Sequence, residues 1–172
     1  MNSENIDGLS SAGLLNGADE YLQAAWLVHG HQDPNRSLLS PIYFLVCQSL
    51  ELALKAYLRG KGKTEDFLVR SIGHDLVAAL DVAEREGLSG HVKIEAMELH
   101  ALTKINAYYN SKDLQYALSY FNKSYPSVEV LSALAKKLVV GLDDFCLKTS
   151  MLHDGKSTAV VTLRGKRKVN CA

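Results

Sequence analysis

The segment from Pro41 to Arg59 constrains the fold of this chain most strongly. Apolar residues occupy most of its circumference, which predicts a long helix in the middle of a helical bundle. Its polar residues, Gln48, Glu51, Lys55 and Arg59, are spaced so that they form one stripe along that helix. Because an unpaired buried charge is costly, this stripe must either find partners inside the bundle or line a binding site.

Four other segments show apolar residues at helical spacing, and together they predict the fold class. They are 18–29, a segment that begins near Gly73 and His74 and ends at about 86, 92–109, and a segment that ends near Leu147. Ser127 is the expected N-cap of the last one. We therefore expect an all-α antiparallel bundle of about five helices. Ser40 is the expected N-cap of the central helix, a single helical turn is expected within 64–70, and 110–125 fits either a helix or extended chain.

The last residues of the chain differ from the rest in composition. We expect one helical domain over residues 1–149 and a basic tail over residues 150–172. From Lys156 onward the tail has five basic residues and no acidic one, and residues 159–163 are rich in β-branched side chains. A single strand is not stable alone, so the tail either forms a short β-like hairpin against the bundle or is disordered.

Composition narrows the class of protein further. The residues before Lys156 carry 14 of the 19 Lys and Arg and all 19 Asp and Glu, a net charge of −5, which does not favour wrapping nucleic acid over a broad face. The longest apolar run, Ile42 to Cys47, is too short to cross a bilayer, and the first residues lack a signal-peptide pattern. The three cysteines contain no C-x-x-C pair. We expect a cytoplasmic protein with no membrane contact, no metal site and no cofactor.

The polar stripe is the leading candidate for a binding site. Glu51 and Lys55 are four residues apart with the acid first, the favourable order for an ion pair. One interpretation is that they face His74 across a cleft, with Gln48 and Asp75 beside them, and bind a ligand there. The other interpretation is structural: Glu51 and Lys55 form a surface ion pair, and His74 caps the next helix. Secondary ligand-binding candidates are Arg70, Tyr108, Lys112 and Tyr116.

The order of these pieces resembles a known family. Gln48-x-x-Glu51-Leu-x-Leu-Lys55 followed by Gly73-His74-Asp75-Leu76 is similar to bacterial HEPN-type domains, helical bundles of the nucleotide-binding type. Three later pieces resemble the second half of the same group: Asn106-x-Tyr108-Tyr109, Leu114-x-Tyr116 and Tyr125-Pro126-Ser127. The resemblance covers roughly residues 18–145. Gln115 stands where family members carry an arginine, which argues against anion binding at that position.

The family includes endoribonucleases, which use an arginine followed after four to six residues by a histidine. Arg70 and His74 are one residue too close for this motif. Arg85 and His91 have an allowed spacing, but Gly87 and Gly90 lie between them, so their side chains would not share a helix face. We interpret both pairs as chance matches and expect a protein that is not an enzyme.

The leading functional hypothesis is therefore a catalytically inactive HEPN-like binding module. The resemblance implies a nucleotide, an RNA end or a partner protein as its ligand, in a bacterial stress or defence context such as a toxin–antitoxin system. A HEPN metal-independent endoribonuclease toxin and a structural dimerising helical protein are the alternatives. We also expect a homodimer, because the apolar run Tyr43–Val46 winds around the central helix and exposes more apolar surface than one neighbour can cover.

Overall fold

The computed structural model describes residues 10–31, 38–116 and 124–153, and all secondary structure in these ranges is helical. Five helices are long: α1 (Ser11–Gly30), α2 (Leu39–Gly60), α3 (Leu76–Arg85), α4 (Ala96–Asn110) and α6 (Val128–His153). A π-helical turn η1 (Phe67–Ile72), a 3₁₀ turn η2 (Leu88–Gly90) and a short helix α5 (Asp113–Tyr116) join them. The predicted all-α bundle is confirmed for these ranges.

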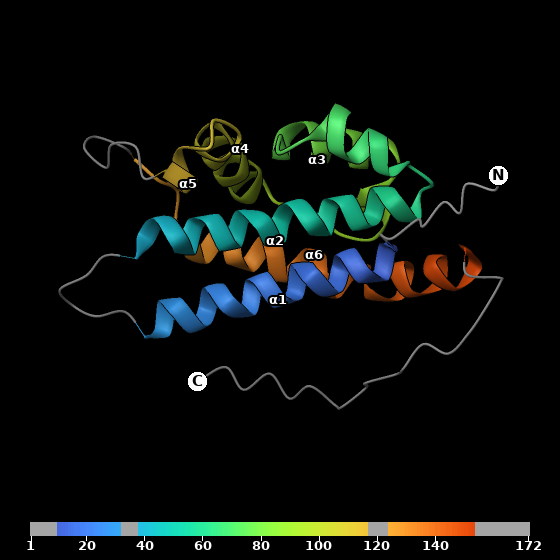
Figure 1. Cartoon of the computed structure of the whole chain (residues 1–172), viewed down its shortest axis with the longest axis horizontal. Coiled ribbons are helices and arrows are strands. Elements are labelled where there is room, and N and C mark those ends of the chain that lie inside the picture. The colour runs from blue at the N-terminus through green and yellow to red at the C-terminus, as the bar shows by residue number, and fades with distance from the viewer. Residues whose placement is uncertain (1–9, 32–37, 117–123, 154–172) are drawn as a thin grey trace, which may run out of the picture.

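Helix α2 is the centre of the bundle, as its apolar sequence predicts. It packs against α1 and α6 on one side and against α3 and α5 on the other (Figure 1). Helix α1 is antiparallel to α2 and α6. Its start lies beside their ends: the Ser11 hydroxyl donates to the carbonyl of Ala56 near the end of α2, and the amide of Ala12 donates to Ser150 near the end of α6. Helices α2 and α6 therefore run in the same direction, with α3, α4 and α5 between them in the sequence.

Local interactions set the helix ends, and some differ from the sequence prediction. Ser40 is not the N-cap of α2. It lies inside the helix, and its hydroxyl donates to the carbonyl of Leu114, which ties α2 to α5. Helix α1 begins at Ser11 rather than near residue 18, because the hydroxyl of Ser10 accepts a hydrogen bond from the amide of Gly13 and caps it.

The second half of the chain shows similar differences. Helix α4 begins at Ala96, four residues later than predicted, because a capping box joins Glu95 and Glu98 there. Helix α6 begins after Ser127 as predicted, but it continues past Leu147 to His153. Residues 154–172, which hold most of the expected tail, lie outside the described residues. So do residues 117–123 of the segment 110–125, for which the sequence fitted either a helix or extended chain. Within that segment, Asp113–Tyr116 is helical.

None of the helices in the described ranges is both long enough and apolar enough to cross a membrane.

Close contact between α6 and the segment before α4 depends on Gly141. A Cβ atom at this position would lie 2.5 Å from Cγ2 of the buried Val92 and 3.4 Å from the carbonyl oxygen of His91. Valine is stiff about its χ1 angle, so it cannot easily move aside. Glycine in a helix normally costs stability relative to alanine, and here that cost is offset by the close approach of two backbones.

We therefore expect Gly141→Ala to lower the free energy of unfolding by roughly 2 kcal/mol, because overpacking outweighs the better helix propensity of alanine. Gly30→Ala is the matched control, since nothing lies within 4 Å of a Cβ at that helical position. Chemical denaturation of both variants checks the prediction. Equal stability of the two would show that α6 does not pack as closely on Val92 as described.

Candidate functional site

The carboxylate of Glu51 is the centre of a buried polar cluster. Its Oε1 accepts a hydrogen bond from Lys55 Nζ at 2.6 Å, and its Oε2 accepts from the Tyr109 hydroxyl at 2.6 Å and from His74 Nδ1 at 3.0 Å. Glu51 is only 4% exposed and Lys55 8%. We call these four residues, Glu51, Lys55, His74 and Tyr109, the Glu51 cluster. The expectation that Glu51, Lys55 and His74 lie together is confirmed.

The four members of the cluster come from three parts of the bundle, and Glu51 and Lys55 are both on α2. Tyr109 is in the last turn of α4, and its ring packs edge-on against His74 with centroids 6.0 Å apart. His74 lies in the turn between η1 and α3, where Gly73 has a φ of 59° that favours glycine. The turn thus brings an imidazole from outside any helix onto a carboxylate inside the bundle.

His74 is the exposed edge of the cluster. Its side chain is 45% exposed, whereas that of Glu51 is 6% exposed. Because the Glu51 carboxylate can only accept, the proton of this hydrogen bond is assigned to Nδ1. The other ring nitrogen, Nε2, has no hydrogen bond within the described part of the chain and remains available to a ligand.

Burial and the nearby Glu51 carboxylate keep the Tyr109 hydroxyl and the Cys47 thiol protonated. Burial, followed by the charge of Glu51 and its hydrogen bond, raises the pKa of the Tyr109 hydroxyl far above its usual value. Tyr109 therefore acts as a neutral donor. Burial and the same carboxylate also raise the pKa of the Cys47 thiol strongly, so this cysteine behaves as a core residue and not as a nucleophile.

Asp75, one of the expected ligand-binding residues, has a structural role in the bundle. It is the N-cap of α3, where its Oδ1 accepts from the amide of Ala78 at 2.9 Å and from Asn106 Nδ2 at 3.0 Å. Asn106 in turn accepts from the amide of Leu76. The capping function that the structural interpretation gave to His74 belongs to Asp75, and this leaves the His74 ring to bind Glu51.

The remaining stripe residues lie on either side of the Glu51–Lys55 pair. Gln48 is half-buried, about one turn before Glu51 on the same side of α2. Arg59 is one turn beyond Lys55, and its Nη1 donates to the carbonyl of Lys63 after the helix. The stripe therefore serves two purposes: its centre binds the turn before α3, and its end holds the loop after α2.

The secondary candidates are not gathered around the Glu51 cluster by any described contact. Arg70 of η1 forms an exposed ion pair with Asp66, the residue before η1. Tyr108 packs on Tyr125 with ring centroids 5.0 Å apart, beside the last residues before α6. Lys112 is an exposed turn residue with a φ of 63°. Tyr116 ends α5, and its side chain lies outside what the structure describes.

The two Arg–His pairs also have separate environments. Arg70 binds Asp66, while His74 binds Glu51. Arg85 Nε donates to the carbonyl of Asp81, while His91 packs against the rings of Tyr57 and Phe145. In neither pair does a described contact bring the guanidinium and the imidazole together.

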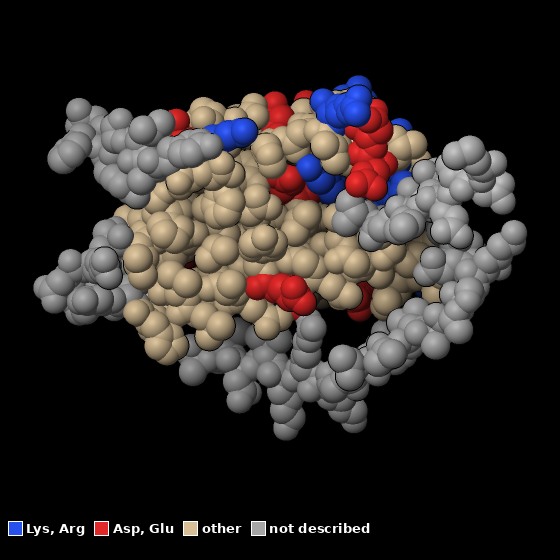
Figure 2. All heavy atoms as spheres, in the orientation of Figure 1, with Lys and Arg blue, Asp and Glu red and all other residues tan. Residues whose placement is uncertain are grey.

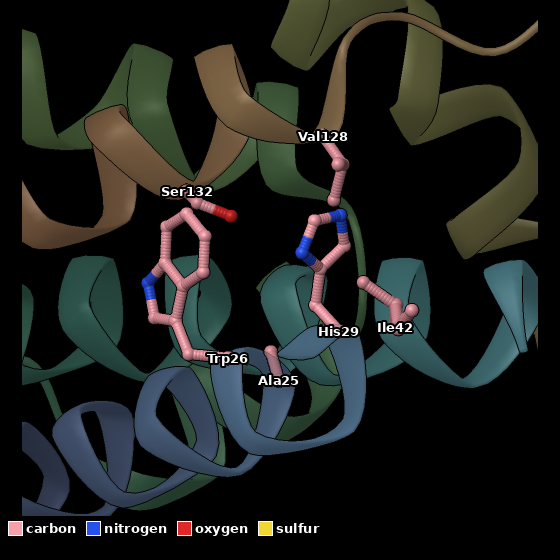
Figure 3. Close-up of a pocket in the computed structure, with 6 residues that line it drawn as sticks. All are labelled: Ala25, Trp26, His29, Ile42, Val128 and Ser132. Atoms are coloured by element: carbon pink, nitrogen blue, oxygen red, sulfur yellow. The ribbon is translucent and has the colours of Figure 1, made fainter. Parts of the chain in front are cut away.

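A separate hollow lies where α1, α2 and α6 meet (Figure 3). Trp26 and His29 of α1 extend toward Val128 and Ser132 of α6, with Ala25 and Ile42 completing the lining. It has essentially no room for even a water-sized molecule, so it is a gap in the side-chain packing and not a ligand pocket.

Among the described residues, no group of three or more His, Cys, Asp or Glu side chains is arranged to hold a metal ion. Comparison with known proteins adds no assignment: no protein-family model matches the chain, and no curated protein or solved structure matches it significantly.

Tyr109 and Asn106 contact members of the candidate site, although the sequence did not predict either of them there. Both belong to the segment Asn106-x-Tyr108-Tyr109 of α4. Their signal was the spacing of three residues, which places two polar groups on one face of α4. Nothing in the sequence tells which other helix that face meets.

We expect Glu51→Ala to lower the free energy of unfolding by about 3 kcal/mol, because it leaves the Lys55 ammonium and the Tyr109 hydroxyl buried without their acceptor. Glu84→Ala, on the exposed side of α3, is the control and should change stability by no more than about 0.5 kcal/mol. Urea denaturation of both variants is the measurement. A small effect at Glu51 would mean that the cluster is open to solvent.

Proposed function

We propose that this chain is a HEPN-like binding module without catalytic activity, which binds its ligand or partner at the His74 edge of the Glu51 cluster. One observation carries the proposal. Nδ1 of His74 is held by a buried carboxylate, while nearly half of the side chain is exposed. A side chain that is fixed on one side and exposed on the other loses little conformational entropy when it binds.

The family part of the proposal rests on the sequence resemblance, to which the Glu51–Lys55–His74 arrangement adds support. The resemblance suggests a nucleotide, an RNA end or a partner protein as the ligand, and a cytoplasmic role in bacterial stress or defence such as a toxin–antitoxin system. The separate partners of the two Arg–His pairs favour binding over RNA cleavage.

We expect native mass spectrometry of the purified protein to reveal a bound small molecule or partner that is reduced in His74→Gln. Glutamine removes the imidazole at the exposed edge while keeping a polar side chain. His100→Gln is the matched control, because His100 is exposed on α4 and forms none of the contacts of the Glu51 cluster. Equal retention of the ligand by both variants would place the binding site elsewhere.

The same preparations test the nuclease alternative. Metal-free protein should leave a mixed pool of single-stranded RNA intact. Cleavage that disappears in both His74→Ala and Arg70→Ala would replace the binding module with an endoribonuclease.

A dimerising role is the second candidate, and it is favoured by one face of the bundle. In this view one acidic group lies on the middle of α1, α2 is otherwise largely uncharged, and the other charged side chains gather toward the end of α2 and over α3 (Figure 2). We define the α1–α2 face by five apolar residues of these two helices that are half-buried or exposed: Tyr21, Leu27, Phe44, Leu45 and Leu52. The sequence argument for a dimer also named Tyr43 and Val46, but both are buried within the chain.

If the α1–α2 face pairs two copies, Leu27→Glu should raise the dimer dissociation constant by about tenfold or more, because a charge would be desolvated at the contact. Leu27 is 65% exposed, so the substitution should not disturb folding. Met97→Glu, an equally exposed position on α4, is the control. Sedimentation velocity at tens of micromolar, roughly the range for stable dimers, measures the effect. A monomeric wild-type protein would remove this candidate.

A further inference from the structure

The α1–α2 face is an apolar surface with a firmly packed floor. A Cβ at Gly17 of α1 would lie 3.3 Å from Cδ1 of Leu52, so the Leu52 side chain rests on the backbone of α1. The Phe44 ring packs against Tyr109 of the Glu51 cluster, with ring centroids 6.2 Å apart. Leu27 nevertheless remains 65% exposed within the described part of the chain. The face is therefore held in place by the bundle while its outer side chains remain open to another segment.

The described chain ends beside one of the two helices that form this face. The Ser150 hydroxyl of α6 accepts a hydrogen bond at 2.9 Å from the amide of Ala12, at the start of α1. Helix α6 ends about one turn later, at His153, and residues 154–172 follow directly. The rest of the chain therefore leaves the bundle next to the start of α1.

The segment after α6 is long enough to reach the exposed part of the face. Because a helix rises about 1.5 Å per residue, Tyr21 lies about 14 Å along α1 from Ala12, and Leu27 about 22 Å. An extended chain over residues 154–163 spans up to roughly 33 Å. Its last five residues, 159–163, read Ala-Val-Val-Thr-Leu. This apolar segment can therefore lie beside both exposed side chains of α1.

Charge favours α1 over the other surface at this end of the bundle. Helix α1 contains Asp19 and Glu20 and no Lys or Arg. The end of α2, which lies beside the start of α1, is followed by Lys61 and Lys63. From Lys156 onward the chain has five basic residues and no acidic one. These residues are therefore attracted to α1 and repelled from the end of α2.

We propose that residues 159–163 dock on the α1–α2 face of the same chain and cover it. Their valine and leucine side chains remove Leu27 from water, and the basic residues on either side of them lie near the acidic groups of α1. A segment tethered this closely has an effective concentration of roughly millimolar, which favours it over a second copy of the chain at micromolar concentration.

Docking of this segment has a consequence for association. It occupies the surface that pairing of two copies would require, so each chain can use the face for only one of the two contacts. The segment thereby controls whether the face is open to a second copy. The His74 edge takes no part in this contact, so the proposal is independent of the ligand binding proposed there.

Thiol labelling of the full-length protein tests the docking. Leu27→Cys and Met97→Cys, each made with Cys171→Ser, place a thiol at positions that are 65% and 66% exposed on the bundle. The remaining cysteines, Cys47 and Cys146, are buried. Iodoacetamide should label Leu27→Cys about tenfold more slowly than Met97→Cys, because the covered thiol reacts only when the segment is displaced. Equal labelling rates would overturn the proposal.

Substitutions after α6 identify the segment that gives the protection. Val161→Glu should raise the labelling rate of Leu27→Cys by about tenfold, because a charge would have to be desolvated against the apolar face. Val169→Glu is the matched control, since it makes the same change beyond the basic residues and should leave the protection intact. Protection that survives Val161→Glu would mean that a segment other than 159–163 covers the face, and it would overturn the proposal.

Charge reversal and protein concentration separate the remaining possibilities. Glu20→Lys should weaken the protection, whereas Asp144→Lys, at an exposed acid of α6, should not. Equal effects of the two substitutions would contradict docking along α1. Docking within one chain gives the same protection at about 1 µM and about 100 µM protein. Protection that increases with concentration would identify a second copy as the occupant of the face and overturn docking of the segment.

Discussion

The rest of the structure depends on the three hydrogen bonds that the buried Glu51 carboxylate accepts. A charge this deeply buried is tolerated only when donors surround it, and its three donors come from α2, from the turn before α3 and from the end of α4. The cluster therefore fixes the positions of α3 and α4 relative to α2. Apolar packing could hold these helices together with several rotations, whereas a carboxylate with three directed hydrogen bonds selects one of them.

The sequence was sufficient to predict the central helix and the meeting of Glu51, Lys55 and His74. Both predictions rest on a strong physical signal: an apolar helix must be buried, and the charges it carries must then be paired. Helix ends were predicted less well. Ser40 has the residue type of an N-cap, but a carbonyl from distant α5 competes for its hydroxyl, and such a long-range partner leaves no local trace in the sequence.

Tyr109 and Asp75 show the same limit in the candidate site. The residue types were visible, but their roles depend on which elements meet. The sequence does not indicate that Asp75 lies beside Asn106 and caps α3. Periodicity predicts the buried side of each helix, but it does not predict the partner of that side.

The π-helical turn η1 has a consequence for how this chain can vary. A π-helix holds more residues in each turn than an α-helix does, so it behaves like an α-helical turn with one extra residue. Because the wide turn already holds the extra residue, removing one from Phe67–Ile72 would let the segment return to α-helical geometry with little rotation of the residues that follow. His74 follows almost immediately, so its imidazole would keep its orientation toward Glu51. The segment can therefore vary both in composition, at exposed positions such as Val69, and by the loss of one residue, while the buried carboxylate keeps its His74 donor.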